Sequence, residues 1–144
     1  MLVSKLMTQP IVSVGLDDTL KVVKHIFENA KFHHLLVVED GVLFGVLSDR
    51  DLLKALSPFI GTPRETPHDT VTLNRKVHQI MTRKPITLLP NADVHTAISI
   101  FNRYNISCIP IVNEDGKPVG IVSWRDILRS IENSYMKKQS KKPH

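Results

Sequence analysis

Cysteine, tryptophan and long apolar segments are scarce in this chain of 144 residues, which has one residue of each of the first two kinds. The single cysteine, Cys108, excludes an intramolecular disulfide and favours a reducing compartment. No apolar run approaches the ~20 residues that a membrane-spanning helix needs. The amino terminus also lacks the pattern of a signal peptide. We therefore expect a cytoplasmic protein that does not associate with membranes.

The motifs that usually carry catalysis are also missing. The sequence contains neither a P-loop nor a dinucleotide-binding loop, although it has six glycines. None of its seven histidines has the His-x-x-x-His spacing that suits a metal on a helix, and the one Glu-x-x-His pair, Glu65 with His68, is interrupted by Pro67. Cys108 lies in an apolar stretch without a basic neighbour in sequence, which favours a buried, inert thiol over a nucleophile. The sequence predicts that the protein is not an enzyme and has no metal site.

Positive charge is concentrated at the carboxyl end. The formal net charge is +5 and the isoelectric point is near 9.5. Without Lys137, Lys138, Lys141 and Lys142 the net charge falls to +1, so the rest of the chain is nearly neutral. A solvated, frayed tail is one interpretation, and contact with nucleic acid or an acidic surface is the other. We favour the first and do not expect nucleic acid to be the main partner.

The chain contains an internal repeat. Residues 45–51, with the sequence GVLSDRD, recur 75 residues later as GIVSWRD at residues 120–126. Residues 3–8 correspond to residues 77–82, after which the second copy gains one residue near Arg83. Two units of about 54 residues therefore cover most of the chain, and a repeated unit usually cannot bury its hydrophobic face alone. We expect two half-cores that pack into one domain.

Each copy predicts the order β-α-β-β-α, so the fold class is α+β. In the first copy we expect a strand near residues 10–14 and an amphipathic helix that starts at residues 17–19, where acidic and hydroxyl side chains can accept from free amides. Two apolar runs follow, separated by Asp40 and Gly41, which is a strong signal for a hairpin. A last helix begins near Ser48.

The second copy predicts the same elements: a strand at residues 86–89, a helix through residues 94–101, a hairpin turning at residues 114–116 and a helix from about Trp124 into the tail. Residues 57–69 are rich in proline, threonine and glycine and indicate a linker. A short amphipathic helix is expected from Thr72 to Met81. The boundaries that we predict are a first repeat at 1–57, a linker with a leading helix at 58–76, a second repeat at 77–131, and a helix end with the basic tail at 132–144.

The repeated heptad places a serine at a helix start with an aspartate three residues on, as Ser48 with Asp51 and as Ser123 with Asp126. This is the spacing of a capping box, in which hydroxyl and carboxylate satisfy free backbone amides. The alternative interpretation is a ligand site. A helix amino terminus can hold a phosphate, and the aspartate can accept hydrogen bonds from the two hydroxyls of a ribose.

Glycine stands inside the preceding apolar strand in both copies, at Gly45 and at Gly120. A glycine within a strand indicates close approach of a ligand or of other backbone. Together with the serine and the aspartate, these glycines outline a nucleotide site.

The ordered motifs resemble the CBS domain, named after cystathionine β-synthase. These motifs are Val-x-x-hydrophobic-Met-Thr, Pro-Ile, an amphipathic helix, a hairpin through Asp-Gly, and Gly-hydrophobic-hydrophobic-Ser-x-Arg-Asp, and they occur twice between about residues 2 and 131. Two copies in tandem resemble a CBS pair, or Bateman module. The resemblance implies two βαββα repeats related by pseudo-twofold symmetry. It also implies clefts between the repeats that bind AMP, ADP, ATP or S-adenosylmethionine.

The resemblance also suggests which residues bind the adenosyl ligand. Asp51 and Asp126 resemble the ribose ligands, and Ser48 and Ser123 the contacts to phosphate or ribose. The remaining candidates border the base or line the clefts, and they are Thr8, Pro10, Ile11, Thr82, Pro85, Ile86, His33, His34, Cys108, Ile109 and Pro110, with Gly45 and Gly120.

The two copies differ at positions that matter for a ligand. Leu35 stands where the second copy has Pro110, and Asp49 stands where it has Trp124. The extra carboxylate of Asp49 would repel a polyphosphate, whereas Trp124 either stacks on an adenine or covers the domain surface. We therefore expect two unequal clefts.

Two functions remain open from the sequence. The first is a regulatory module without a required cofactor, which senses an adenosyl ligand and acts on an unknown effector protein in trans. The second is a structural module with vestigial clefts that forms a homodimer and touches nucleic acid through its tail. The retained serine and aspartate of both copies favour the first, and the resemblance suggests a homodimer in either case.

Overall fold

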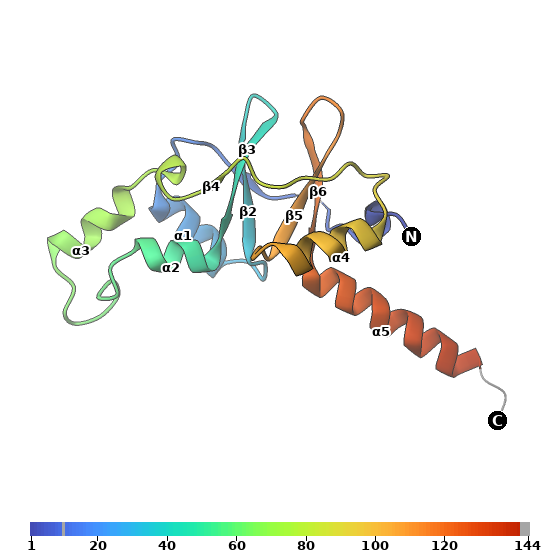
Figure 1. Cartoon of the computed structure of the whole chain (residues 1–144). Helices are drawn as coiled ribbons and strands as arrows, with labels where there is room; N and C mark the ends of the chain where they lie inside the picture. Colours follow the sequence, from blue (N-terminus) through green and yellow to red (C-terminus); the bar gives the residue numbers. More distant parts are fainter. Residues whose placement is uncertain (10, 142–144) are drawn as a thin grey trace. The chain divides into compact units, whose positions relative to one another are not determined.

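The computed structural model describes residues 1–9 and 11–141, and the chain divides into two compact units (Figure 1). Residues from Val12 to Pro85 form one of them, called here the central unit. The other, the terminal unit, combines Met1–Ile11 with Ile86–His144. The amino-terminal segment therefore belongs to the unit that contains the second repeat.

The central unit is a four-stranded sheet with helices. In chain order its elements are β1 (Ser13–Val14), α1 (Leu20–Glu28), β2 (His34–Glu39), β3 (Val42–Ser48), α2 (Asp49–Ala55), α3 (Pro67–Val71), the 3₁₀ turns η2 (Thr72–Asn74) and η3 (Val77–Gln79), and β4 (Thr82–Arg83). The strand order is β1-β2-β3-β4. β1 is parallel to β2, and the other neighbours are antiparallel. The predicted order β-α-β-β-α is confirmed.

The hairpin between β2 and β3 turns where the sequence predicted. Asp40 and Gly41 have φ of 50° and 78°, the left-handed backbone that a tight two-residue turn needs. The two strands that this turn joins bury Leu35, Val37 and Leu47 completely. The turn thus fixes the register in which these side chains reach the core.

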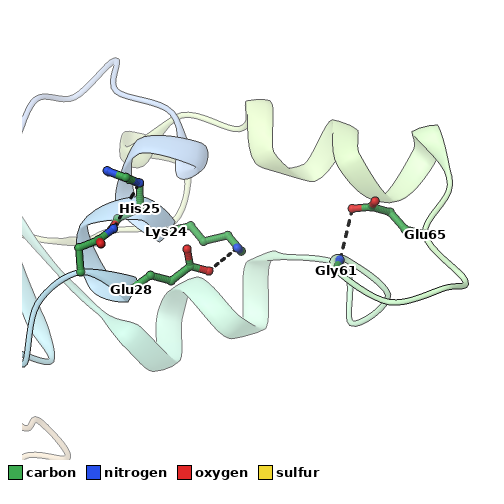
Figure 2. A network of polar contacts seen from close by, with 6 residues as sticks. Lys24, His25, Glu28, Gly61 and Glu65 are labelled. Atoms are coloured by element: carbon green, nitrogen blue, oxygen red, sulfur yellow. Dashed lines mark hydrogen bonds and ion pairs between the residues drawn. The ribbon is translucent and has the colours of Figure 1, made fainter.

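Helix α1 buries Leu20 and Val23 and carries its charges on the other side, where Lys24 pairs with Glu28 one turn later (Figure 2). Its predicted start is confirmed, since Thr19 is the N-cap, but the predicted capping is wrong because the Thr19 side chain makes no cap hydrogen bond. The carboxylate of Asp18 instead accepts from the Gly15 N–H at 2.7 Å. The helix is held in place by packing of its apolar face.

The terminal unit repeats this plan with shorter strand pairing. It contains η1 (Val3–Lys5), α4 (Val94–Arg103), β5 (Cys108–Val112), β6 (Pro118–Ser123) and α5 (Trp124–Lys141). The strand predicted at residues 86–89 is reduced to one parallel bridge between Leu88 and Ile111. Pro85 and Pro90 lack a backbone N–H and cannot extend that ladder.

The leading segment of each repeat packs into the unit that contains the other repeat. Val77 belongs to the core of the central unit, and its N–H donates to the Asp18 carbonyl at 2.8 Å. Val3 belongs to the core of the terminal unit, and its N–H donates to the Ala92 carbonyl at 2.8 Å. Both valines have no exposed surface. The compact units therefore differ from the repeats seen in sequence by an exchange of these leading segments.

The helix predicted from Thr72 to Met81 is wrong. Two 3₁₀ turns occupy this region, separated by the extended residues Arg75 and Lys76. Lys76 forms an antiparallel bridge with Thr19, and the Leu20 N–H donates to the Arg75 carbonyl at 3.0 Å. Pairing with the segment ahead of α1 has therefore overridden the helical spacing of the apolar residues.

The linker is ordered by its own polar contacts. α3 begins inside it, and Asp69 accepts from the Thr66 N–H at 2.8 Å and from the Ser57 hydroxyl at 2.6 Å. The Ser57 hydrogen bond is the main reason why the pKa of Asp69 is lowered. Glu65 accepts from the Gly61 N–H at 3.3 Å (Figure 2). The region predicted as a linker thus holds a capped helical turn.

Helix α5 is 18 residues long, whereas its counterpart α2 has seven (Figure 1). It continues through Lys137 and Lys138, so the prediction of a frayed tail is wrong for these two lysines, and residues 142–144 lie outside the described part of the chain. Among the described residues, no helix has both the length and the apolar character that crossing a membrane requires.

Candidate functional site

The repeated serine and aspartate form a capping box in the central unit. Ser48 is the N-cap of α2; its Oγ accepts from the Asp51 N–H at 3.1 Å, while Asp51 Oδ2 accepts from the Ser48 N–H at 2.9 Å. The Asp49 N–H donates to the His33 carbonyl at 3.0 Å. These three amides are therefore occupied. Among the described residues no donor contacts Asp51 Oδ1, which leaves that oxygen as an acceptor.

The terminal unit has the same box at the start of α5. Asp126 Oδ2 accepts from the Ser123 N–H at 2.8 Å and lies 3.1 Å from the Ser123 hydroxyl, which donates to it. The Asp126 N–H donates to Ser123 Oγ at 3.3 Å. Asp126 Oδ1 lies 3.9 Å from Nη1 of Arg129, which is an ion pair of loose geometry. The capping interpretation of both motifs is confirmed.

Each box lies beside the threonine of the other repeat's leading segment. Thr82 in β4 pairs with Val46, two residues before Ser48. Thr8 pairs with Ile121, two residues before Ser123, through a Thr8 N–H bond to the Ile121 carbonyl of 2.8 Å. The sequence predicted that both threonines border the base of a ligand, and it contains no signal for the exchange of the leading segments. In each unit a predicted threonine nevertheless lies near a predicted pair of serine and aspartate.

The two strand glycines are explained by close protein neighbours. A Cβ built on Gly45 would lie 2.7 Å from the Thr82 carbonyl oxygen and 2.7 Å from Met81 Sδ. A Cβ on Gly120 would lie 2.5 Å from Met7 Sδ. The close approach that the sequence predicted at these glycines therefore exists, and its partners are the leading segments.

The positions that differ between the repeats have different surroundings. Asp49 Oδ2 lies 2.8 Å from His33 Nδ1, so this histidine, predicted to line a cleft, binds the extra carboxylate. The corresponding Trp124 is 47% exposed, and the Arg125 guanidinium lies 5.9 Å from its ring centroid. One unit thus presents a histidine–carboxylate pair where the other presents an aromatic ring.

The other predicted residues are divided between the two units. His34 pairs with Ser48 across the β2–β3 hairpin, and Cys108 pairs with Ser123 across the β5–β6 hairpin. Pro85 belongs to the central unit, whereas Ile11, Ile86, Ile109 and Pro110 belong to the terminal unit. Pro10 lies outside the described residues.

Gln9, a polar residue of the first leading segment, was not among the predicted residues, and Arg83 holds the corresponding place in the second. The Gln9 amide donates to the Val119 carbonyl at 2.7 Å, and the Arg83 guanidinium donates to the His78 carbonyl at 3.1 Å. Only the pairing of the leading segments reveals their positions. Within the described part of the chain no three histidine, cysteine, aspartate or glutamate side chains gather as metal ligands would.

Comparison with protein families identifies the repeats. The CBS domain model matches residues 3–58 and again residues 77–133. The chain belongs to the CBS domain family. A CBS domain-containing protein of Dictyostelium discoideum is 33% identical over 129 residues, with 88% of each chain covered. The tandem CBS pair inferred from the sequence is confirmed.

Two solved CBS structures are similar over most of this chain. The CBS domain pair of protein MJ0100, in complex with 5′-methylthioadenosine and S-adenosyl-L-methionine, has a TM-score of 0.75 and 26% identity and covers 93% of this chain and 98% of its own. A CBS domain protein of Pyrobaculum aerophilum, complexed with AMP, has a TM-score of 0.70 and 26% identity over 88% and 89%. Other relatives with enzyme names are longer, and this chain spans 24% of an L-aspartate semialdehyde sulfurtransferase.

Proposed function

We propose that this CBS pair is a regulatory module that binds an adenosine-containing ligand: AMP, ADP, ATP or S-adenosylmethionine. Support comes from the two solved CBS structures at 26% identity, which hold AMP, or S-adenosylmethionine with 5′-methylthioadenosine. The observation in this chain that carries the proposal is the pair of aspartates, Asp51 and Asp126. In each aspartate Oδ2 takes part in the capping box, whereas Oδ1 does not.

A carboxylate oxygen of this kind suits a ribose. Adjacent ribose hydroxyls are donors, and hydrogen bonds to a charged acceptor contribute about 1.5–3 kcal/mol each. The capping box holds the carboxylate in one orientation before the ligand arrives, which lowers the entropic cost of binding. At α2 the amides of Ser48, Asp49 and Asp51 are occupied. The proposal for this unit therefore rests on the carboxylate and the ribose, with the phosphate in a lesser role.

The two sites are proposed to be unequal. Asp49, paired with His33, adds negative charge near Asp51, which disfavours a polyphosphate there. Trp124 near Asp126 offers an exposed aromatic face on which a base can stack. We therefore assign the tighter nucleotide site to the terminal unit and the weaker one to the central unit.

The regulatory output follows from unequal affinity of the ligand for different arrangements of the protein. A ligand shifts a conformational equilibrium only as far as its affinities for the two states differ. An effector protein in trans then reads the change, as the sequence suggested. The chain itself is proposed to have no catalytic activity.

Thermal shift measurements with AMP, ADP, ATP and S-adenosylmethionine test the proposal. At a hundredfold excess over Kd, binding stabilises the fold by about 2.7 kcal/mol, which raises the Tm of a domain of this size by roughly 5–10 °C. We expect a shift with at least one compound. A panel without any shift contradicts the proposal.

Separate variants Asp51→Ala and Asp126→Ala assign the ligand to the aspartates. Each is expected to lower affinity at one site by about 10- to 100-fold, because a charged acceptor is lost, and each also loses a cap worth about 1 kcal/mol. Asp69→Ala is the matched control, since Asp69 forms the same kind of box with Thr66 in the linker. This control should melt earlier and bind normally. Unchanged ligand affinity in both Asp51→Ala and Asp126→Ala would mean that the two capping boxes do not bind the ligand and only stabilise their helices.

A homodimer is the second part of the proposal. Its supporting observation is Leu53 on α2, an apolar side chain that is 73% exposed. Burial of such a side chain in an interface contributes about 1.5–3 kcal/mol. Sedimentation equilibrium of the wild type beside Leu53→Ser gives the oligomeric state, and a wild-type monomer at all concentrations rules the dimer out.

A further inference from the structure

One side of helix α5 is polar and lies against the amino-terminal segment of the same unit. Intervals of three or four residues, which place side chains on one side of a helix, separate its members Asp126, Ser130, Asn133 and Lys137. The Ser130 hydroxyl donates to Met1 Sδ at 3.7 Å. The polar side of α5 therefore forms a boundary with another segment of the terminal unit.

A pocket, called here the α5 pocket, lies at this boundary. It has a volume of about 280 Å³. One wall is formed by Met1, Lys5 and Leu6, and the other by residues of α5 between Asp126 and Lys137. Pockets that enclose a whole small molecule have volumes of about 300–1,000 Å³. The α5 pocket is therefore of a size to hold part of a ligand.

Both walls of the α5 pocket are anchored in the core of the terminal unit. Ile127 anchors α5, and Val3 anchors the 3₁₀ turn that ends at Lys5. The Val3 N–H also donates to the Ala92 carbonyl at 2.8 Å. A pocket between two anchored elements exists before a ligand arrives, which lowers the entropic cost of binding.

Positive charge prevails in the α5 pocket. Lys5, Arg129 and Lys137 line it together with a single carboxylate, that of Asp126. The Asp126 side chain is only 10% exposed, and its partner Arg129 is held loosely at 3.9 Å. Within the described part of the chain neither lysine forms an ion pair. Clustered cations without counter-ions repel one another, so an anion that enters the pocket relieves this repulsion.

The carboxylate and the cations follow one another along the helix. Asp126 lies in the first turn of α5 and Arg129 one turn later, whereas Lys137 lies roughly 16 Å beyond Asp126 along the axis at 1.5 Å per residue. Helical side chains lean toward the amino terminus of their helix, so Lys137 leans back toward Arg129. A ligand that fits this order has hydrogen-bond donors at one end and several negative charges beyond them.

We propose that the α5 pocket binds the phosphates of an adenosine polyphosphate, ADP or ATP, whose ribose is held by Asp126. The proposal rests on the adenosyl-binding function proposed above and names the ligand class of the terminal unit. The single phosphate of AMP lies next to the ribose and so reaches only Arg129, whereas a longer phosphate chain extends toward the lysines. The positively charged sulfonium of S-adenosylmethionine would face three cations, and like charges oppose binding.

Isothermal titration with adenosine, AMP, ADP and ATP tests the proposal in Asp51→Ala, in which the site of the terminal unit remains. We expect the affinity to rise about tenfold or more from adenosine to ATP, because each added phosphate forms further ion pairs. Added salt should weaken the binding of ATP and leave that of adenosine unchanged, since salt screens charges. Inorganic triphosphate probes the phosphate contacts alone and should bind more weakly than ATP.

Variants of the lysines locate the phosphates. Lys5→Gln with Lys137→Gln should weaken ATP about five- to tenfold, because two exposed ion pairs are lost, and should leave the affinity for adenosine unchanged. Lys138→Gln is the matched control, since Lys138 follows Lys137 in the chain but lines a separate groove between α4 and α5. This control should bind both compounds as Asp51→Ala does. Far-UV circular dichroism checks that each variant is folded.

Four results would overturn the proposal. Equal affinities for adenosine and ATP, both lost when Asp126→Ala is added, would remove the phosphate contacts and leave the adenosyl-binding function standing. An equal loss of ATP affinity in Lys138→Gln would mean that the helix attracts anions without a specific pocket. Inorganic triphosphate that binds as tightly as ATP would make a free polyphosphate the ligand. Absence of binding by all five compounds would overturn the adenosyl-binding function of this unit as well.

Discussion

Glycine occupies the same position in both repeats, but the cost of replacing it differs. At Gly45 the space for a Cβ is limited by a backbone atom, the Thr82 carbonyl oxygen. At Gly120 the three nearest atoms all belong to the Met7 side chain. Methionine is unbranched and adapts its shape readily, whereas a paired strand cannot move without losing hydrogen bonds. Equivalent residues thus differ in the kind of neighbour that excludes a side chain.

Substitution by alanine tests this difference. Gly45→Ala should destabilise the protein by about 1–3 kcal/mol, because the added methyl overpacks the contact with β4. Gly120→Ala should cost less, because Met7 can change rotamer. Urea unfolding of both variants gives the two free energies of unfolding. Equal losses would mean that the β4 backbone adjusts as easily as the methionine does.

At the scale of elements, the leading segments determine which residues form a site. β4 places Thr82 beside the box of Ser48 and Asp51. The bridge with Ile121 places Thr8 beside the box of Ser123 and Asp126. The segment that follows the linker therefore pairs with the first repeat, and the amino-terminal segment pairs with the second. If the boxes bind ribose, these threonines belong to the site in the same unit.

Valine substitutions test that pairing of elements. Thr82→Val should weaken the ligand site that Asp51→Ala removes, and Thr8→Val the site that Asp126→Ala removes, each by a few-fold because one neutral hydrogen bond contributes about 1 kcal/mol. Isothermal titration of the single and double variants measures the coupling. Residues of one site should show non-additive effects, while residues of different sites should add. Additivity of Thr82→Val with Asp51→Ala would separate the threonine from the site.

Elements governed by local signals could be predicted from the sequence. The helix with Leu20 and Val23 inside, the turn at Asp40 and Gly41, and the box of Ser48 with Asp51 follow from periodicity, turn chemistry and capping. The helix expected from Thr72 to Met81 failed because its residues pair with a segment distant in sequence.

The candidate site was predictable to the same extent. Both aspartates follow from the repeated motif, since a capping box involves only residues that are close in sequence. The pairing of His33 with Asp49 links residues 16 apart, and the partners of Thr8 and Thr82 lie farther away still. Such pairings depend on strand register, which a single sequence does not specify.

At the scale of the whole molecule, the amino-terminal segment is structural. Val3 is fully buried, and the Val94 N–H at the start of α4 donates to the Met1 carbonyl at 2.9 Å. The fully buried Val77 has the corresponding role in the central unit, but it is enclosed by chain on both sides. The terminal unit therefore depends on residues at the start of this sequence, which a truncation can remove.

Deletion of residues 1–9 is expected to destabilise the terminal unit more than the central unit. It removes a fully buried valine, whose loss alone costs about 2 kcal/mol or more, together with the bridge at Thr8. Hydrogen exchange followed by mass spectrometry should show loss of protection in β5, β6 and α4 with retained protection in β2 and β3. Uniform loss in both units would show that they unfold together.

The exchanged segments also set an order in time. During synthesis residues 1–9 leave the ribosome before the rest of this sequence, yet the backbone partners of this segment include Pro90, Ala92 and Ile121. The central unit has all of its residues as soon as Pro85 has been made. Residues 1–9 thus belong to the unit that is completed later, and Val3 cannot enter its core until residues well beyond Pro85 have been made. Contacts so distant in sequence are the ones that slow folding.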